Sequence, residues 1–102
     1  MANFTIRVEL HGADPVDYET LHALMATIGC VRELTGTDAS GGIGVWMLPT
    51  AEYDYTDPTR NAFQVRDLVK VIADRARLGA WVLVTEVKDR AWNTKKIRSG
   101  PS

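Results

Sequence analysis

Residues 3–15, which read Asn-Phe-Thr-Ile-Arg-Val-Glu-Leu-His-Gly-Ala-Asp-Pro, join a strand pattern directly to the start of a helix. Apolar and polar side chains alternate from Phe4 to Leu10, and this period of two is typical of a half-buried strand. Asp14 then supplies an N-cap, and Pro15 is a favoured first helical residue. We therefore expect a strand over 3–10 and a helix that begins at Pro15.

The residues after Pro15 predict this helix and then two strands. The helix ends at about Ile28, because Gly29 follows as a residue suited to a left-handed cap. Its apolar stripe, at spacings of three and four, consists of Tyr18, Leu21, Leu24, Met25 and Ile28. Segments 30–35 and 43–48 are β-prone, and the glycine-rich segment between them predicts a hairpin.

The second half of the chain predicts a loop, a helix and a strand. Segment 50–58 has no clear period, and we interpret it as a loop with exposed tyrosines. A helix is expected from about Arg60 to Leu78, with Asp57 or Thr59 as its N-cap. Residues 81–87 are β-prone and predict the last strand. The buried candidates on the helix are Phe63, Leu68, Val71, Ile72 and Ala76.

The order strand, helix, strand, strand, helix, strand predicts an α+β protein with a ferredoxin-like βαββαβ fold. Two right-handed crossovers that share one sheet place both helices on the same face. The expected sheet is antiparallel and four-stranded, with strand order 4-1-3-2 and an opposite face open to solvent. The 102 residues fit one domain, which we place at 1–90, followed by a basic, flexible tail at 91–102.

Charge is unevenly distributed along the chain, although its net value is only −1. Residues 1–57 hold two basic and nine acidic side chains, a net charge of −7, whereas residues 58–102 hold ten basic and four acidic ones, a net charge of +6. This asymmetry indicates either an acidic or nucleic-acid partner, or two halves that pair with each other.

Other features restrict the classes of function. No apolar stretch approaches the roughly 20 residues of a membrane span, and no leader pattern is present, so we expect a cytoplasmic protein without a membrane role. Cys30 has no partner for an internal disulfide and is interpreted as a core residue. His11 and His22, the two histidines, do not predict a metal site of usual composition, and no cofactor motif occurs. We interpret His22 as a boundary residue of the first helix.

Basic residues predict an RNA-binding surface. Three of them recur at helical spacings of four and seven on the second helix, and others continue through the tail, where a tryptophan is suited to stack on an unpaired base. The predicted RNA-binding set is Arg66, Lys70, Arg77, Lys88, Arg90, Trp92, Lys95, Lys96 and Arg98. The alternative is a solvated helix face with a basic tail.

The acidic aromatic segment supports a hypothesis of another class. A non-enzymatic interaction module, of phage or prophage origin, would bind a basic or nucleic-acid-binding protein through this segment. Its candidate residues are Glu52, Tyr53, Asp54, Tyr55 and Asp57.

Segments 4–13, 17–22, 48–53 and 82–86, with Arg90 and Trp92, together resemble the short bacterial and prophage proteins grouped with the GhoS endoribonuclease antitoxins. The resemblance covers roughly residues 3–93. It implies a ferredoxin-like fold, RNA binding, and cleavage of the message of a small membrane toxin, as in a type V toxin–antitoxin system. A homodimer is an arrangement that the sequence leaves open.

The chemistry of such cleavage would be metal-free in this chain. Related CRISPR-associated nucleases hold a metal with an aspartate at the end of the first strand, where this sequence has Leu10-His11-Gly12. Arginine and histidine would instead position a ribose 2′-hydroxyl and stabilise the phosphorane. The candidate catalytic residues are Arg7, His11 and Arg32.

Overall fold

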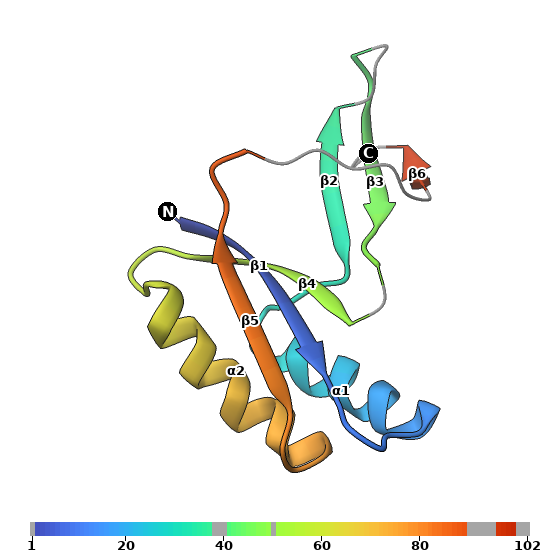
Figure 1. Ribbon diagram of the computed structural model, residues 1–102. Coiled ribbons are helices and arrows are strands. Elements are labelled where there is room, and N and C mark those ends of the chain that lie inside the picture. The colour runs from blue at the N-terminus through green and yellow to red at the C-terminus, as the bar shows by residue number, and fades with distance from the viewer. Residues whose placement is uncertain (1, 38–40, 50, 90–95, 100–102) are drawn as a thin grey trace.

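The fold is given by a computed structural model, which describes residues 2–37, 41–49, 51–89 and 96–99 (Figure 1). The described part of the chain alternates helices with short strands. In chain order the elements are β1 (Ala2–Glu9), α1 (Pro15–Thr27), β2 (Glu33–Thr37), β3 (Ile43–Met47), β4 (Glu52–Asp57), α2 (Ala62–Ala76), β5 (Trp81–Glu86) and β6 (Lys96–Ser99).

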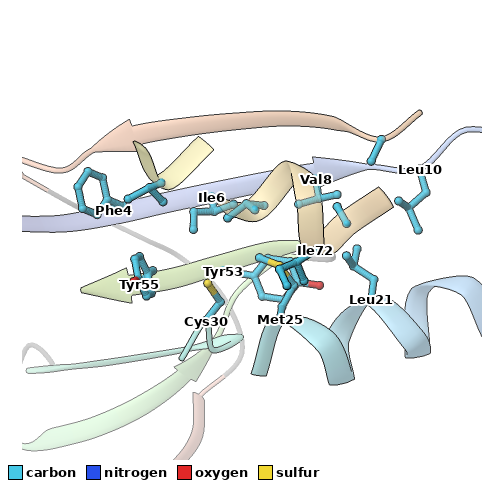
Figure 2. Close-up of a cluster of buried hydrophobic side chains, with 14 residues drawn as sticks. Phe4, Ile6, Val8, Leu10, Leu21, Met25, Cys30, Tyr53, Tyr55 and Ile72 are labelled. Atoms are coloured by element: carbon cyan, nitrogen blue, oxygen red, sulfur yellow. The ribbon is translucent and has the colours of Figure 1, made fainter. Parts of the chain in front are cut away.

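The main sheet is antiparallel and three-stranded, in the order β4-β1-β5. Phe4, Ile6 and Val8 of β1 are buried and belong to the core formed with α1 and α2 (Figure 2). Leu21 and Met25 are the fully buried residues of α1. The alternation on β1 and the apolar stripe of α1 are therefore confirmed, and the helices leave the other face of the sheet uncovered.

A second antiparallel sheet has the order β2-β3-β6 and projects away from the two helices (Figure 1). It joins the main sheet through Val31, whose backbone N–H and C=O both hydrogen-bond to Asp54. Leu34, Val45 and Leu48 are buried in or beside this sheet, but they are not part of the main core.

The expected single sheet with order 4-1-3-2 is wrong, because the chain forms two separate three-stranded sheets. The segment predicted as a strand over 30–35 pairs with β4 only at Val31 and then diverges into β2. There its hairpin partner β3 also pairs with β6, so these strands satisfy their backbone hydrogen bonds away from the main sheet.

The loop expected over 50–58 is also wrong, because residues 52–57 are strand β4 of the main sheet. Tyr53 and Tyr55 lie opposite Ile6 and Phe4 in the β1–β4 register and are buried in the core. Burial of two aromatic rings stabilises this strand and outweighs the acidic composition of the segment.

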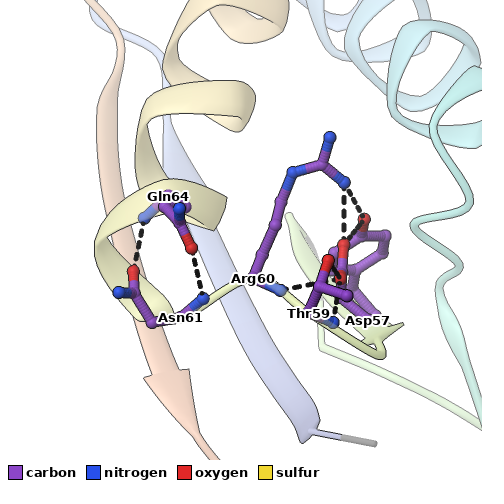
Figure 3. Close-up of polar contacts among 6 residues, drawn as sticks. Asp57, Thr59, Arg60, Asn61 and Gln64 are labelled. Carbon is purple, nitrogen blue, oxygen red and sulfur yellow. Dashed lines mark hydrogen bonds and ion pairs between the residues drawn. The ribbon is translucent and has the colours of Figure 1, made fainter.

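Both helix starts carry a reciprocal hydrogen-bond pair. At α1, the Asp14 carboxylate accepts the Asp17 N–H at 3.0 Å and the Asp17 carboxylate accepts the Asp14 N–H at 3.2 Å, which confirms the predicted cap. At α2, the cap expected at Asp57 or Thr59 is wrong. Asn61 accepts the Gln64 N–H, and the Gln64 side chain accepts the Asn61 N–H, each at 2.9 Å (Figure 3).

Asp57 instead holds the turn that leads into α2. Its carboxylate accepts the backbone N–H groups of Thr59 and Arg60 at 2.8 and 2.9 Å, the Arg60 guanidinium at 2.8 Å and the Tyr55 hydroxyl at 2.7 Å (Figure 3). These donors, led by the two backbone N–H groups, hold the pKa of the Asp57 carboxyl well below its usual range.

The remaining expectations for the second half have mixed outcomes. Phe63 and Val71 are exposed on α2, contrary to prediction, because the helix buries a different stripe, which includes Ile72. Residues 91–95 and 100–102 of the expected tail lie outside the described residues, whereas residues 96–99 form β6. In the described part of the chain, neither helix combines the length and the apolar character that crossing a membrane requires.

Candidate functional site

The open face of the main sheet, opposite the helices, is the candidate site. Directly opposed residues of an antiparallel pair share a face. Glu9 of β1 lies opposite Trp81, and Arg7 lies between Leu83 of β5 and Glu52 of β4. Together with the next row, the open face comprises Thr5, Arg7, Glu9, Glu52, Asp54, Trp81, Leu83 and Thr85.

Two large apolar side chains on this face are exposed. Trp81 and Leu83 have exposed fractions of 66% and 62%, although they are two residues apart in a regular strand. Arg7, Glu9 and these two side chains line a shallow hollow of about 160 Å³. Exposed apolar side chains gathered at one hollow mark an interaction site more often than scattered ones do.

His11 places a second aromatic ring against Trp81. It lies in the turn after β1, and its ring meets the Trp81 ring at a near-perpendicular angle of 70°, with centroids 4.2 Å apart. Such an edge-to-face contact holds the Trp81 ring in place. Among the described residues, the Arg7 side chain has no hydrogen-bond or ion-pair partner.

The charge of the open face is negative. Glu9, Glu52 and Asp54 contribute three carboxylates, and Arg7 is the one permanent cation among the residues that make up the face. A phosphate backbone would meet net repulsion there, whereas a partner with lysine or arginine side chains would be attracted.

The structure does not bring the three candidate catalytic residues together. Arg7 and His11 both lie beside Trp81 on the open side of the sheet. Arg32 follows Val31, which lies beside β4, and its charge acts on Tyr53, whose ring is in the core. Arg32 is therefore on the helix side of the sheet, where its Nε is buried without a hydrogen-bond partner.

A hydrogen-bonded pair of polar side chains lies near Arg32. The Tyr53 hydroxyl and the His22 Nδ1 share a hydrogen bond of 2.5 Å, which links β4 to α1. Burial, followed by the nearby charge of Arg32, lowers the pKa of His22, and burial raises the pKa of the Tyr53 hydroxyl. Both groups are therefore held in their neutral forms at neutral pH.

Three residues of the predicted RNA-binding set, two on α2 and one at its C-cap, are engaged within the protein. Arg66 pairs with Asp67 at 2.9 Å. Lys70 pairs with Asp74 and also donates to the Ala80 carbonyl, at 2.9 and 2.8 Å. Arg77 donates to the His11 carbonyl at 2.7 Å and approaches Asp17 at 3.5 Å, so it ties α2 to the start of α1.

The other members of that set are dispersed. Lys88 is exposed just after β5. The Lys96 ammonium lies 5.6 Å from the centre of the Trp46 ring, and the backbone of Arg98 in β6 pairs with β3. The remaining three, Arg90, Trp92 and Lys95, lie outside the described residues.

The acidic candidates for protein binding divide between the two faces of β4. Glu52 and Asp54 are half-buried on the open face, whereas Tyr53, Tyr55 and Asp57 are buried on the other side. The predicted exposed acidic aromatic loop is therefore wrong. Of its candidate residues, only the carboxylates of Glu52 and Asp54 lie on the open face, beside Arg7.

Sequence reasoning missed Trp81 and Leu83 as surface residues. The strand over 81–87 alternates two apolar sets, with Val82 and Val84 on the other face, so its pattern does not tell which face is exposed. His22 was interpreted as a boundary residue, and its hydrogen bond depends on Tyr53, which is distant in the sequence.

No group of three or more His, Cys, Asp or Glu side chains within the described ranges is arranged to hold a metal ion. Comparison with known proteins adds no relative, since no family model, curated protein or solved structure matches this chain.

Proposed function

We propose that this protein is a non-enzymatic interaction module that binds a basic protein segment on the open face of the main sheet. The observation that supports this proposal is the exposure of Trp81 and Leu83 within a face that carries three carboxylates. Buried aromatic anchors supply much of the affinity of protein interfaces. Surrounding charges steer the partner and select its sign.

The chemistry of the face indicates how such a segment would bind. A lysine or arginine of the partner would pair with Glu9 or Glu52, and an apolar side chain would cover Leu83. A cation held over the Trp81 ring would gain a further attraction. Arg7 has no partner among the described residues, and it would donate to carbonyl oxygens of the bound segment.

RNA binding, which the resemblance to the GhoS group implies, stays a prediction. Trp81 is suited to stack on a base. The surrounding charge opposes this use, because Arg7 is flanked by carboxylates and the α2 cations are paired with Asp67, Asp74 and Asp17. The three candidate catalytic residues are not gathered at one site, because Arg32 lies apart from Arg7 and His11.

Removal of negative charges from the open face distinguishes a basic protein partner from an RNA partner. Fluorescence anisotropy would measure binding of a labelled peptide rich in Lys, Arg and Leu, and of a labelled single-stranded RNA of mixed sequence. The double variant Glu9→Gln/Glu52→Gln is expected to weaken peptide binding by about tenfold, since two attractive charges are lost. The same variant would strengthen RNA binding, because the phosphates would meet less repulsion.

The contribution of the aromatic anchor is tested separately. Trp81→Ala is expected to weaken peptide binding by about tenfold. Leu78→Ala is the matched control, because Leu78 is 84% exposed in the turn after α2, and it should change the affinity less than about twofold. Peptide binding that neither Trp81→Ala nor the double glutamate variant weakens would contradict the proposal, as would RNA binding to the wild type that is tighter than peptide binding and is abolished by Arg7→Ala.

A further inference from the structure

The outer edge of β5 is an unpaired strand edge. In the described part of the chain, β5 pairs with β1 alone. The Val87 N–H donates to the Asn3 carbonyl of β1 at 2.8 Å. Because backbone groups alternate in direction along a strand, Val82 and Val84 direct their N–H and C=O groups to the free edge.

Lys70 and Asp74 of α2 occupy the backbone groups of Ala80 just before this edge, but β5 itself lacks the usual devices that prevent strand pairing. The sequence Trp-Val-Leu-Val-Thr-Glu of β5 contains no lysine or proline, and the β1–β5 register shows no bulge. Its one charged residue, Glu86, is at the end of the strand. A regular apolar edge of this kind pairs readily with another strand unless something covers it.

A groove runs along the edge between β5 and α2. One hollow of about 340 Å³ is lined by Arg66, Asp67 and Lys70 of α2 with residues 80–82, and a second of about 220 Å³ by Ala62, Phe63 and Arg66 with residues 82–84. Arg66 and Val82 line both, so the two hollows adjoin. Together the two hollows follow residues 80–84 along the edge.

We infer that the chain forms a two-fold symmetric homodimer in which the β5 edges of two copies pair antiparallel. The exposed Trp81 and Leu83 side chains of the strand favour a second copy of the same apolar strand over a charged ligand. Along this side of α2, Arg66 is paired with Asp67 and Lys70 with Asp74, so these four charges sum to zero. Because Arg66 and Lys70 are neutralised by ion pairs within their own helix, they offer little repulsion to a second copy.

The apolar centre of β5 fixes the register of this pairing. With Leu83 opposite Leu83 of the second copy, the outward groups of Val82 hydrogen-bond to those of Val84, and Trp81 lies opposite Thr85. The Leu83 pair is then a non-hydrogen-bonded pair, in which Cα atoms approach to about 4.5 Å. The two leucines, now exposed, would cover each other.

The inference does not depend on the proposed function. Edge pairing uses the backbone of β5, the side of α2 and the Leu83 side chain; it shares Leu83 with the proposed binding face but leaves Arg7 and the Trp81 ring on the open face. It would also place the open faces of two copies side by side in one six-stranded sheet. A dimer without peptide binding, or peptide binding by a monomer, would therefore separate the two proposals.

The oligomeric state is the first test. Sedimentation velocity of the full chain, from roughly 1 to 300 µM, should show a monomer–dimer equilibrium. Val84→Pro removes one outward N–H without removing a hydrogen bond to β1, and it should weaken the dimer by at least about tenfold. Circular dichroism would verify that the variant is folded. A wild-type chain that stays monomeric over the whole range overturns the inference.

Cysteine substitution tests the register without perturbing the core. Leu83→Cys places two thiols at a separation that suits a disulfide, so mild oxidation should convert most of the protein to a covalent dimer. Thr85→Cys, on the same face of the same strand, is the matched control, because its two copies lie far apart in this register. The buried Cys30 is present in both variants. Equal cross-linking of the two variants would overturn the inferred pairing.

Discussion

Cys30 lies in the core, with 2% of its surface exposed, and its chemistry follows from that position (Figure 2). Burial, with a smaller contribution from the charge of Asp54, raises the pKa of the thiol to about 12. The thiolate is the reactive form, so the folded protein should react with a disulfide reagent about 10³-fold more slowly than a thiol of ordinary pKa. Absorbance of the released aromatic thiolate at pH 8 measures this rate.

The same protein in guanidinium chloride is the control for Cys30. Unfolding exposes the thiol and restores its ordinary pKa, so the reaction should become fast and stoichiometric. A native rate equal to the denatured rate would contradict the burial. The core position of Cys30 could be predicted from the sequence alone, because it is a lone cysteine between glycine and valine at the start of a β-prone segment.

The turn between β4 and α2 depends on one carboxylate. Asp57→Asn removes the charge that four donor groups share and leaves an amide that must also place its own N–H groups. We expect the midpoint of thermal unfolding to fall by roughly 5 °C or more. Asp67→Asn, which alters an exposed ion pair on α2, is the matched control and should shift it by about 1 °C or less.

The pH dependence of stability gives an independent check on Asp57. Its folded-state pKa is depressed, so its contribution to stability is present above the ordinary aspartate pKa of about 3.9 and is lost as the pH falls below that value. The difference in unfolding free energy between the wild type and Asp57→Asn should therefore shrink below about pH 4. A difference that stays constant from pH 7 to pH 2 would show that the charge is not responsible.

Elements with a strong local signal were predicted, and those that depend on distant partners were not. The alternation of Phe4 to Leu10 and the Asp14–Pro15 start gave β1 and α1 correctly. Tyr53 and Tyr55 also alternate with polar residues, but four of the residues from 50 to 58 are acidic or proline, and this composition suggested a loop. Only the neighbouring β1 shows that the segment is a strand.

The site was less predictable than the fold for the same reason. Arg7 was placed on an exposed face by the period of its own strand, and that placement is confirmed. The register with β4 and β5 brings Glu52 and Trp81 to that face, and strand register is not encoded locally. The net charge of the open face, which decides between a protein and an RNA partner, could therefore not be predicted from the sequence.

At the scale of the whole molecule, the two sheets should differ in stability. The main sheet shares one apolar core with both helices, whereas the β2-β3-β6 sheet projects away from them (Figure 1). The Val31–Asp54 bridge connects the two sheets, whereas a hydrogen bond of 2.8 Å from the Leu48 N–H to the Arg32 carbonyl extends the β2–β3 pairing within the smaller sheet. Opening the smaller sheet would expose little of the main core.

Native-state hydrogen exchange measures this difference directly. Protected amides of β2 and β3 should exchange at least about tenfold faster than those of β1, which corresponds to an opening free energy lower by about 1.4 kcal/mol. Their exchange should also depend weakly on denaturant, because a partial opening exposes less surface than global unfolding. If amides of β1 and β3 instead share one opening free energy and one denaturant slope, the two sheets unfold as a single unit. In that case the second sheet contributes to global stability through contacts beyond the bridge at Val31.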